Sequence, residues 1–190
     1  MKKESLLLVG VLIVVGVLLG GILISRSSRH TYQPQASSGS TTQIGNSMGH
    51  IQLLQKMVEQ TPRNRRAWVE LGNTYFDSKQ YMSAVQAYSR ALELQPDDPD
   101  VLTDQGVMYR RLGMYDRAIA NFKKAIKLDP EHQQSLYNLG VVYLYNKKDF
   151  KDAKDAWTRF LALSPSGPGA DKVRQELKSL EALQPPASSH

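Results

Sequence analysis

Three consecutive units of the sequence carry the same order of large and small apolar residues, and this repetition constrains the fold more than any other feature. Self-similarity at a fixed period of roughly 20 to 50 residues indicates an array of small stacked units. Corresponding residues lie 34 positions apart, with one residue inserted inside the third unit. They are Trp68, Leu71, Gly72, Tyr75, Ala84, Tyr88, Ala91 and Pro96; Leu102, Gln105, Gly106, Tyr109, Ala118, Phe122, Ala125 and Pro130; and Leu136, Leu139, Gly140, Tyr143, Ala153, Trp157, Phe160 and Pro165.

Each unit is predicted to form a pair of helices, because its apolar residues recur at intervals of three and four. Gly72 stands where the second helix crosses the first, so its small size permits close approach. Ala84 and Ala91 have the same role on the second helix, and Tyr88 fills the space between them. Prolines such as Pro96 follow the second helices and end them. One pair cannot bury its apolar face alone, so the units are expected to stack.

The first unit contains the motif W-x2-L-G-x2-Y in full, from Trp68 to Tyr75. By this motif and its period the chain resembles the tetratricopeptide repeat (TPR) family, whose unit is a helix–turn–helix. The resemblance implies an all-α solenoid of antiparallel helix pairs, preceded here by one transmembrane helix. The expected divisions are an N-terminal capping helix at 46–64, TPR units at 65–98, 99–132 and 133–167, a C-terminal capping helix at 168–183 and a disordered tail at 184–190.

The third unit departs from the pattern in two places. The segment from Asn146 to Asp149 lengthens its turn by one residue, and Phe160 replaces a small residue at the tight crossing. We expect this unit to pack against the C-terminal capping helix, which leaves more room for a large side chain. A ligand contact by Phe160 is the alternative.

Residues 6–24, after a short flank at 1–5, form an apolar stretch without charge or proline. As a helix this stretch crosses a hydrocarbon core of roughly 30 Å, so a transmembrane helix is predicted. A cleaved signal peptide is the alternative, but the exit sequence ILISRSSRH offers no suitable cleavage site. Lys and Arg are balanced on the two sides, so charge does not decide the orientation. Gly16 and Gly20 have a spacing that allows two such helices to form a homodimer.

Residues 25–45 contain no acidic side chain and few large apolar ones. Such a segment cannot bury enough apolar surface to order itself. A disordered linker between the membrane and the repeats is therefore predicted.

The sequence carries no sign of catalytic or cofactor chemistry. It has no cysteine, which excludes disulfides, thiolate metal sites and a cysteine nucleophile. Its histidines are not spaced as metal ligands on one helix face. An acidic cluster lies at the junction of the first and second units, but Asp98 precedes Pro99 at a helix start, where carboxylates act as caps. The members of this cluster are Asp97, Asp98, Asp100 and Asp104. We therefore expect no enzyme activity, no cofactor and no metal site.

The net charge of +6 does not indicate nucleic-acid binding. Residues 46–183 carry 20 basic and 17 acidic side chains, and a nucleic-acid surface would need a basic stripe on one face. The basic segment 147–154 is interleaved with aspartates, which is typical of a solvated helix face. No nucleic-acid partner is expected.

In the resembled family the first helices line a concave groove, and ligands contact a recurring set of positions in it. Carried onto this chain, the resemblance implies a peptide-binding groove formed by Arg66, Asn73, Phe76, Val107, Arg110, Arg111, Tyr137, Val141, Leu144 and Tyr145. Several apolar residues on a face expected to be wet favour a binding surface. The alternative is that they pack against a neighbouring unit or the capping helix.

One subgroup of the family holds a partner's C-terminal carboxylate in a clamp of Lys, Asn and Arg. Asn73 and Asn138 fit that template, but Val69 stands where the lysine is required. An apolar or amphipathic segment with acidic groups that meet Arg110 and Arg111 fits this chain better.

A single N-terminal span, a polar linker and three units resemble bacterial inner-membrane TPR proteins, in particular the assembly factors of cytochrome c maturation and nitrite reductase haem attachment. The phrases WVELGNTYFDSKQY and AVQAYSRALELQPDD carry this resemblance. It implies a single-pass membrane protein whose periplasmic domain binds a peptide or helical segment of a partner protein. The alternative is a structural scaffold that oligomerises in or at the membrane.

Overall fold

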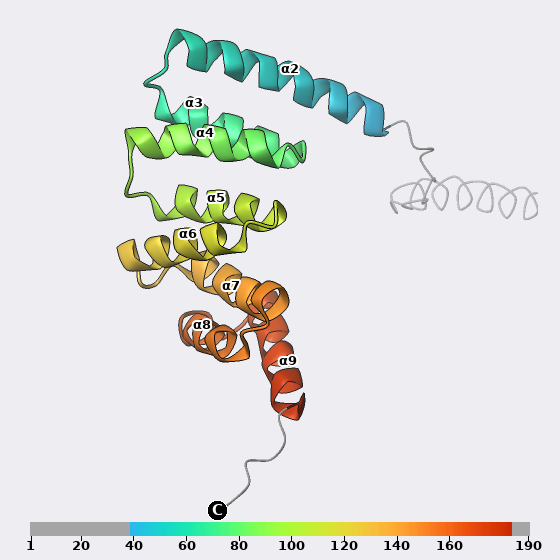
Figure 1. Cartoon of the computed structure of the whole chain (residues 1–190). Helices are drawn as coiled ribbons and strands as arrows, with labels where there is room; N and C mark the ends of the chain where they lie inside the picture. The colour runs from blue at the N-terminus through green and yellow to red at the C-terminus, as the bar shows by residue number, and fades with distance from the viewer. Residues whose placement is uncertain (1–38, 184–190) are drawn as a thin grey trace, which may run out of the picture. The chain divides into compact units, whose positions relative to one another are not determined.

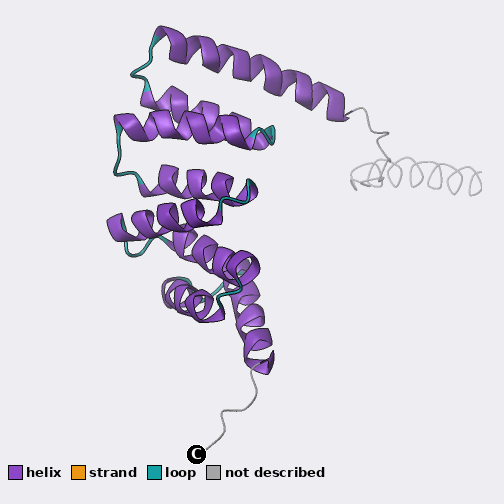
Figure 2. Ribbon diagram, viewed as in Figure 1, coloured by secondary structure: helices purple, strands orange, loops and turns teal. Residues whose placement is uncertain are grey.

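The computed structural model describes residues 39–183. The predicted transmembrane helix at 6–24, with Gly16 and Gly20, and the predicted tail at 184–190 lie outside this range. No strand occurs between residues 39 and 183, and the helices stack in chain order (Figures 1 and 2). No helix in this range is both long and apolar enough to cross a membrane. The elements are α2 (Gly39–Gln60), α3 (Arg65–Asp77), α4 (Tyr81–Leu94), α5 (Pro99–Arg111), α6 (Tyr115–Leu128), α7 (Gln133–Val141), η1 (Val142–Lys147), α8 (Phe150–Leu163) and α9 (Pro168–Leu183).

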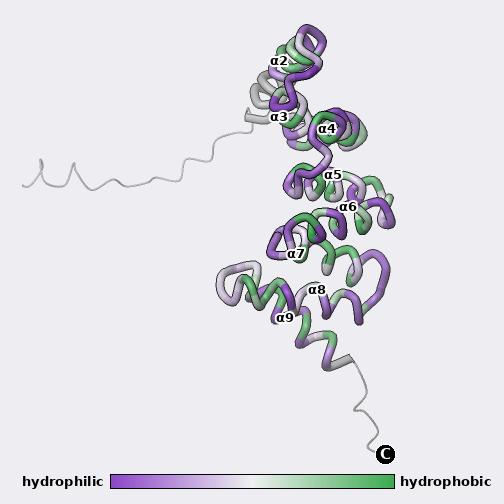
Figure 3. The backbone as a smooth tube through the Cα atoms, turned by 90° about the vertical axis from the view of Figure 1, so that its left-hand side faces the viewer, coloured by the Kyte–Doolittle hydropathy of each residue, from purple (hydrophilic) through white to green (hydrophobic). Residues whose placement is uncertain are grey.

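Three helix pairs correspond to the three sequence units: α3 with α4, α5 with α6, and α7 with α8. The helix α2 packs on α3 before the first pair, and α9 packs on α8 after the last. Hydrophobic and hydrophilic positions alternate along each helix, as the side view in Figure 3 shows. The described part of the chain is therefore the all-helical TPR-like solenoid that the repeat predicts.

The first helix of each unit begins at a polar capping residue. The side-chain oxygens of Asn64 and Asp98 accept hydrogen bonds from the backbone N–H three residues on, at 3.2 and 3.0 Å. His132 does the same through Nδ1, at 3.3 Å. Pro99 follows Asp98 at the first helical position, where its missing N–H would have no helical partner. The predicted capping role of Asp98 is confirmed.

A tyrosine near the end of each first helix anchors the turn to the second helix. The carbonyl oxygens of Tyr75 and Tyr109 each accept the backbone N–H five residues on, at 2.8 Å in both units. One residue inside each turn takes a left-handed conformation, Lys79 with φ 58° and Gly113 with φ 75°. Glycine adopts this conformation without the strain that a side chain adds.

A glycine on the first helix of each unit lies under an aromatic ring of the second helix. The pairs are Gly72 with Tyr88, Gly106 with Phe122 and Gly140 with Trp157. A Cβ added at these glycines would lie 2.5, 2.6 and 2.3 Å from the nearest ring atom. The close crossing predicted from the repeat is confirmed, and the rings fill the space that the glycines leave.

Buried apolar residues form two clusters, one spanning α2 to α5 and the other α6 to α9. Val107 and Tyr109 pack against both clusters, so the core is continuous from unit to unit. A chain of side-chain hydrogen bonds also joins the first and second units. Asn121 Nδ2 donates to Gln105 Oε1 at 2.8 Å, and Gln105 Nε2 donates to Ser89 Oγ at 2.8 Å.

The third unit absorbs its extra residue in a π-helical turn, η1, which continues α7 directly. The sequence prediction confined the insertion to the turn from Asn146 to Asp149, and the structure extends it back into the first helix. The backbone N–H of Asp149 donates to the carbonyl of Tyr143 at 2.9 Å, six residues back instead of five. A π-helical turn takes up one inserted residue without interrupting the helix.

The helix α2 begins at Gly39, before the predicted capping boundary at residue 46. The prediction of a disordered linker over residues 25–45 is therefore wrong for residues 39–45. No proline lies between Pro34 and Pro62 to stop the helix, and each residue added to an existing helix forms one more hydrogen bond.

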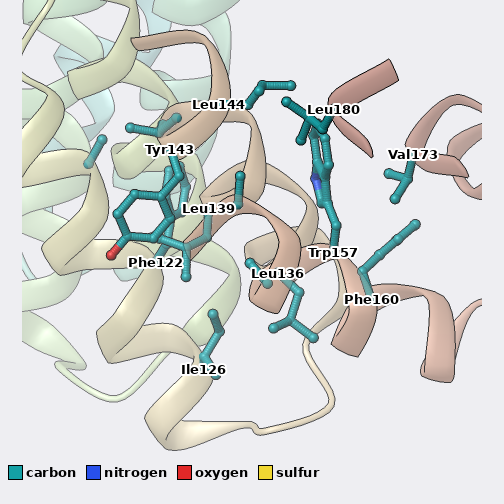
Figure 4. Packing of buried hydrophobic residues seen from close by; sticks show 14 residues of the cluster. Phe122, Ile126, Leu136, Leu139, Tyr143, Leu144, Trp157, Phe160, Val173 and Leu180 are labelled. Atoms are coloured by element: carbon teal, nitrogen blue, oxygen red, sulfur yellow. The ribbon is translucent and has the colours of Figure 1, made fainter. Parts of the chain in front are cut away.

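The helix α9 closes the C-terminal end of the core. Val173 is fully buried and Leu180 is nearly so, both in the cluster that contains Trp157 (Figure 4). Phe160 is also buried, and the site of a Cβ at Gly169 of α9 lies 3.4 Å from its ring. The expected packing of the third unit against the capping helix is confirmed.

Candidate functional site

Nine of the ten predicted groove residues are at least partly accessible, and we call these nine the candidate binding face. Arg66, Asn73, Phe76, Arg111 and Tyr145 are exposed, while Val107, Arg110, Tyr137 and Val141 are half-buried. They lie on α3, α5, α7 and η1, which are the first helices of the three units. Val107 and Val141 also pack against the core, so only one side of each is available to a ligand.

Leu144 is the exception, and its assignment to the groove is wrong. It is 6% exposed and belongs to the C-terminal core cluster together with Leu180 (Figure 4). The π-helical turn changes the angle between successive residues, so Leu144 does not take the direction that a regular α-helix predicts. This residue packs against the capping helix, as the alternative interpretation required.

The C-terminal half of the candidate binding face is aromatic. The rings of Tyr137 and Phe160 lie 5.5 Å apart between centroids, which fixes one side of Tyr137. Tyr145 is 43% exposed, and its hydroxyl donates a hydrogen bond to Glu176 of α9. Partial burial and this carboxylate raise the pKa of Tyr145 to about 12. The helix α9 therefore contributes to this face as well as to the core, which the repeat pattern did not predict.

Arg110 lies close to Tyr137, and the described part of the chain supplies no partner for its charge. Its Nε is shielded from solvent and has no hydrogen bond within the described part of the chain, and neither Arg110 nor Arg111 forms an ion pair there. Burial, followed by the neighbouring charge of Arg111, lowers the pKa of Arg110. A partly buried cation without a partner is costly, and an anionic group supplied by a ligand would relieve that cost.

Acidic groups dominate the earlier part of the same helix. Burial and the nearby carboxylate of Asp100 raise the pKa of Asp104 to about 6. Asp100 itself accepts a hydrogen bond from His132 Nε2 at 3.0 Å, which joins α5 to the start of α7. Helix α5 thus changes from acidic at its start to basic at its end. Sequence reasoning assigned Asp104 only to an acidic cluster, because its burial depends on the neighbouring helices.

Asn73 does not stand free as a clamp residue. Its Oδ1 accepts a hydrogen bond from the hydroxyl of Tyr88 at 2.7 Å, and burial raises the pKa of that tyrosine. Asn138 donates its amide to the backbone carbonyl of Gln134 at 2.8 Å. Both asparagines predicted to fit the carboxylate clamp already have hydrogen-bond partners within the fold.

Comparison with protein families gives one match that spans most of the helical domain. Residues 46–168 match the family described as the TPR domain of cytochrome c-type biogenesis protein H. The chain belongs to this TPR family. The resemblance to cytochrome c assembly factors drawn from the repeat phrases is thereby confirmed at the level of the domain. Comparison with curated proteins gives no match.

Solved structures with the same fold come from several proteins. Similar chains include MamA (TM-score 0.67, 20% identity, 75% of this chain and 82% of that one) and the Arabidopsis OM64 TPR domain (0.57, 20%, 61% and 95%). Another is the first TPR of Spaghetti (RPAP3), solved bound to the HSP90 peptide SRMEEVD (0.58, 23%, 62% and 93%). At these identities the likeness establishes the TPR fold alone.

Within residues 39–183 no group of three or more His, Asp or Glu side chains is arranged to hold a metal ion. The histidines in this range have structural partners instead, since His50 pairs with Glu70 and His132 caps α7.

Proposed function

We propose that this protein is a membrane-anchored TPR module that binds a segment of a partner protein on the candidate binding face, in the assembly of c-type cytochromes. The family match supports the pathway, and residues 6–24 supply the proposed anchor. The observation that carries the proposed site is the half-buried Arg110, which has no charged partner among residues 39–183 and lies close to Tyr137.

The ligand that this face fits is an amphipathic segment. Apolar side chains of such a segment would cover Tyr137, Val141 and Tyr145, and an acidic side chain would meet Arg110 and Arg111. A helix laid along a groove makes contacts of this kind at intervals of three and four residues. The neighbour solved with an HSP90 peptide supports peptide binding as a use of the fold, since that peptide contains acidic residues.

Photo-cross-linking in cells tests this proposal. A photoreactive amino acid at position 141 or 145 is expected to capture a partner that mass spectrometry identifies, whereas the same group at the exposed position Gln80 should not. Tyr137→Ala with Tyr145→Ala should remove the cross-link at 141, and Arg110→Gln should weaken it. Equal capture at all three positions, or none at 141 and 145, would contradict the proposal.

Orientation is tested separately. If the repeat domain lies in the periplasm, alkaline phosphatase fused to the C-terminus is expected to be active. Green fluorescent protein fused to the same end is expected to be non-fluorescent. The reverse pattern would place the domain on the cytoplasmic side.

A structural scaffold is the second candidate, and the surface of α2 favours it. Met48, Leu53 and Met57 are exposed at 58, 57 and 39% on this terminal helix. A contact between copies through this helix predicts a molecular mass that rises with concentration in light scattering, and Leu53→Lys with Met57→Lys should abolish the rise.

A further inference from the structure

A cavity of about 500 Å³ opens between α2, α3 and α4, and it shares no residue with the candidate binding face. Trp68, Leu71 and Tyr75 contribute to its lining from α3, and Val58 and Ala87 contribute from the helices on either side. Trp68 is held in place by a hydrogen bond from its indole N–H to the carbonyl of Pro62, at 2.8 Å. The volume is within the range of small-ligand and side-chain pockets.

The tyrosine in this cavity differs from its counterparts in the other two units. In the second unit the guanidinium of Arg117 lies 5.6 Å from the ring centroid of Tyr109, and in the third the ammonium of Lys123 lies 5.7 Å from that of Tyr143. A cation within about 6 Å of an aromatic face is attracted by the ring. No such cation lies over Tyr75 within the described residues.

The repeat explains why the first unit lacks this cation. Arg117 follows Tyr109 by eight residues, and the same step from Tyr75 reaches Ser83. Lys123 precedes Tyr143 by 20 residues, and the same step back from Tyr75 reaches Gln55. The two positions that correspond to Arg117 and Lys123 are therefore neutral, and both line the cavity.

Charges around the cavity favour a basic ligand. Glu59 from α2 and Glu93 from α4 line it together with a single cation, Arg90. Arg90 is paired with Glu93 at 2.7 Å, whereas Glu59 forms no ion pair among residues 39–183. An incoming cation would therefore meet an uncompensated carboxylate beside the Tyr75 and Trp68 rings.

We propose that this cavity binds a lysine or arginine side chain of a partner protein, which completes at Tyr75 the cation–ring contact that the other two units make internally. The aliphatic part of such a side chain would cover Leu71 and Ala87, and its charged end would lie near Glu59. This site is separate from the candidate binding face, so it gives the module a second point of contact with a partner.

The test is a titration of the isotope-labelled full chain with two short peptides that differ in one group. In acetyl-Gly-Ser-Arg-Ser-Gly-amide the arginine is charged, and in the matched peptide citrulline replaces it. The arginine peptide is expected to give a saturable shift of the Trp68 indole N–H resonance, with an affinity at least tenfold above that of the citrulline peptide. The indole of Trp157, which is buried, should not move. Equal affinities, or no shift with the arginine peptide, would overturn the proposal.

Variants that supply the missing cation internally make the test specific. Ser83→Arg copies the second unit and Gln55→Lys copies the third, so each is expected to lower the affinity for the arginine peptide at least tenfold. Gln80→Arg adds the same charge at an exposed position outside the cavity and should change the affinity less than twofold. Unchanged binding in a folded Ser83→Arg or Gln55→Lys protein would contradict the proposal, whatever the cross-linking at positions 141 and 145 reveals.

Discussion

The helical glycines of this protein differ in how much space surrounds the position of a Cβ atom. Gly72 lies under the buried ring of Tyr88, whose hydroxyl is hydrogen-bonded to Asn73 and cannot move away freely. Gly49 of α2 has no heavy atom within 4 Å of the place where a Cβ would stand. The same substitution should therefore change stability in opposite directions at the two positions.

Gly72→Ala is expected to lower the free energy of unfolding by about 1–3 kcal/mol, because the new methyl group overpacks the crossing. Gly49→Ala is expected to raise it by up to about 1 kcal/mol, because alanine favours the helix. Urea denaturation followed by circular dichroism measures both. A Gly72→Ala protein as stable as the parent would show that the two helices can separate at no cost.

The raised pKa of Asp104 makes a signed prediction about pH. The folded pKa of about 6 lies above 3.8, the ordinary pKa of an aspartate. The folded state therefore binds the proton more tightly, and this group's contribution to stability falls as pH rises between those values. Asp104→Asn removes the effect. The free energy of unfolding of the Asp104→Asn variant, relative to that of the parent protein, should rise by about 1–2 kcal/mol between pH 4.5 and pH 7.5.

Denaturation at the two pH values measures the difference between parent and variant. Asp116→Asn is the control, since Asp116 is exposed and its ion pair with Lys147 lies at the surface. A difference for Asp104→Asn that is independent of pH would show that Asp104 does not titrate between 4 and 6.

The C-terminal capping helix α9 supplies buried side chains to the core of the third unit. Val173→Ala should lower the free energy of unfolding by about 1–2.5 kcal/mol, because Val173 is fully buried in the core cluster and its loss leaves a cavity. Lys172→Ala, one residue away and exposed, should stay within about 0.5 kcal/mol of the parent. Equal effects of the two changes in thermal or urea denaturation would mean that α9 does not hold this position.

Some of the helix boundaries could be predicted from the sequence pattern, and others could not. Asp98 with Pro99 predicted a helix start, and the structure begins α5 there, because capping depends only on residues next to each other in the chain. The π-helical turn and the early start of α2 were not predicted. An inserted residue can be absorbed anywhere along a unit, and the choice depends on how the following helix packs.

At the scale of the whole molecule, each unit contacts only its neighbours, so stability should vary along the stack. Helix α5 is hydrogen-bonded to the preceding unit through Gln105 and Ser89, and to the following unit through Thr103 and Ser135. Among residues 39–183, α2 and α9 have neighbouring helices on one side only. Native-state hydrogen exchange is expected to give the strongest amide protection in α5 and α6, and weaker protection in α2 and α9. Uniform protection across all helices would indicate that residues 39–183 unfold as one cooperative unit.

The amino-acid sequence was enough to predict the period, the helix pairs, the glycine–aromatic crossings and the cap at Asp98. These features depend on residue size and on spacing along one chain, which a repeat displays directly. Tertiary packing alone buries Leu144, joins Tyr145 to Glu176 of α9 and leaves Arg110 without a charged partner among residues 39–183. It also revealed the cavity at Tyr75, where the missing cation becomes visible only once α2 and α4 lie on either side. Each of these depends on which side chains of separate helices meet in space, and spacing along the chain does not carry that information.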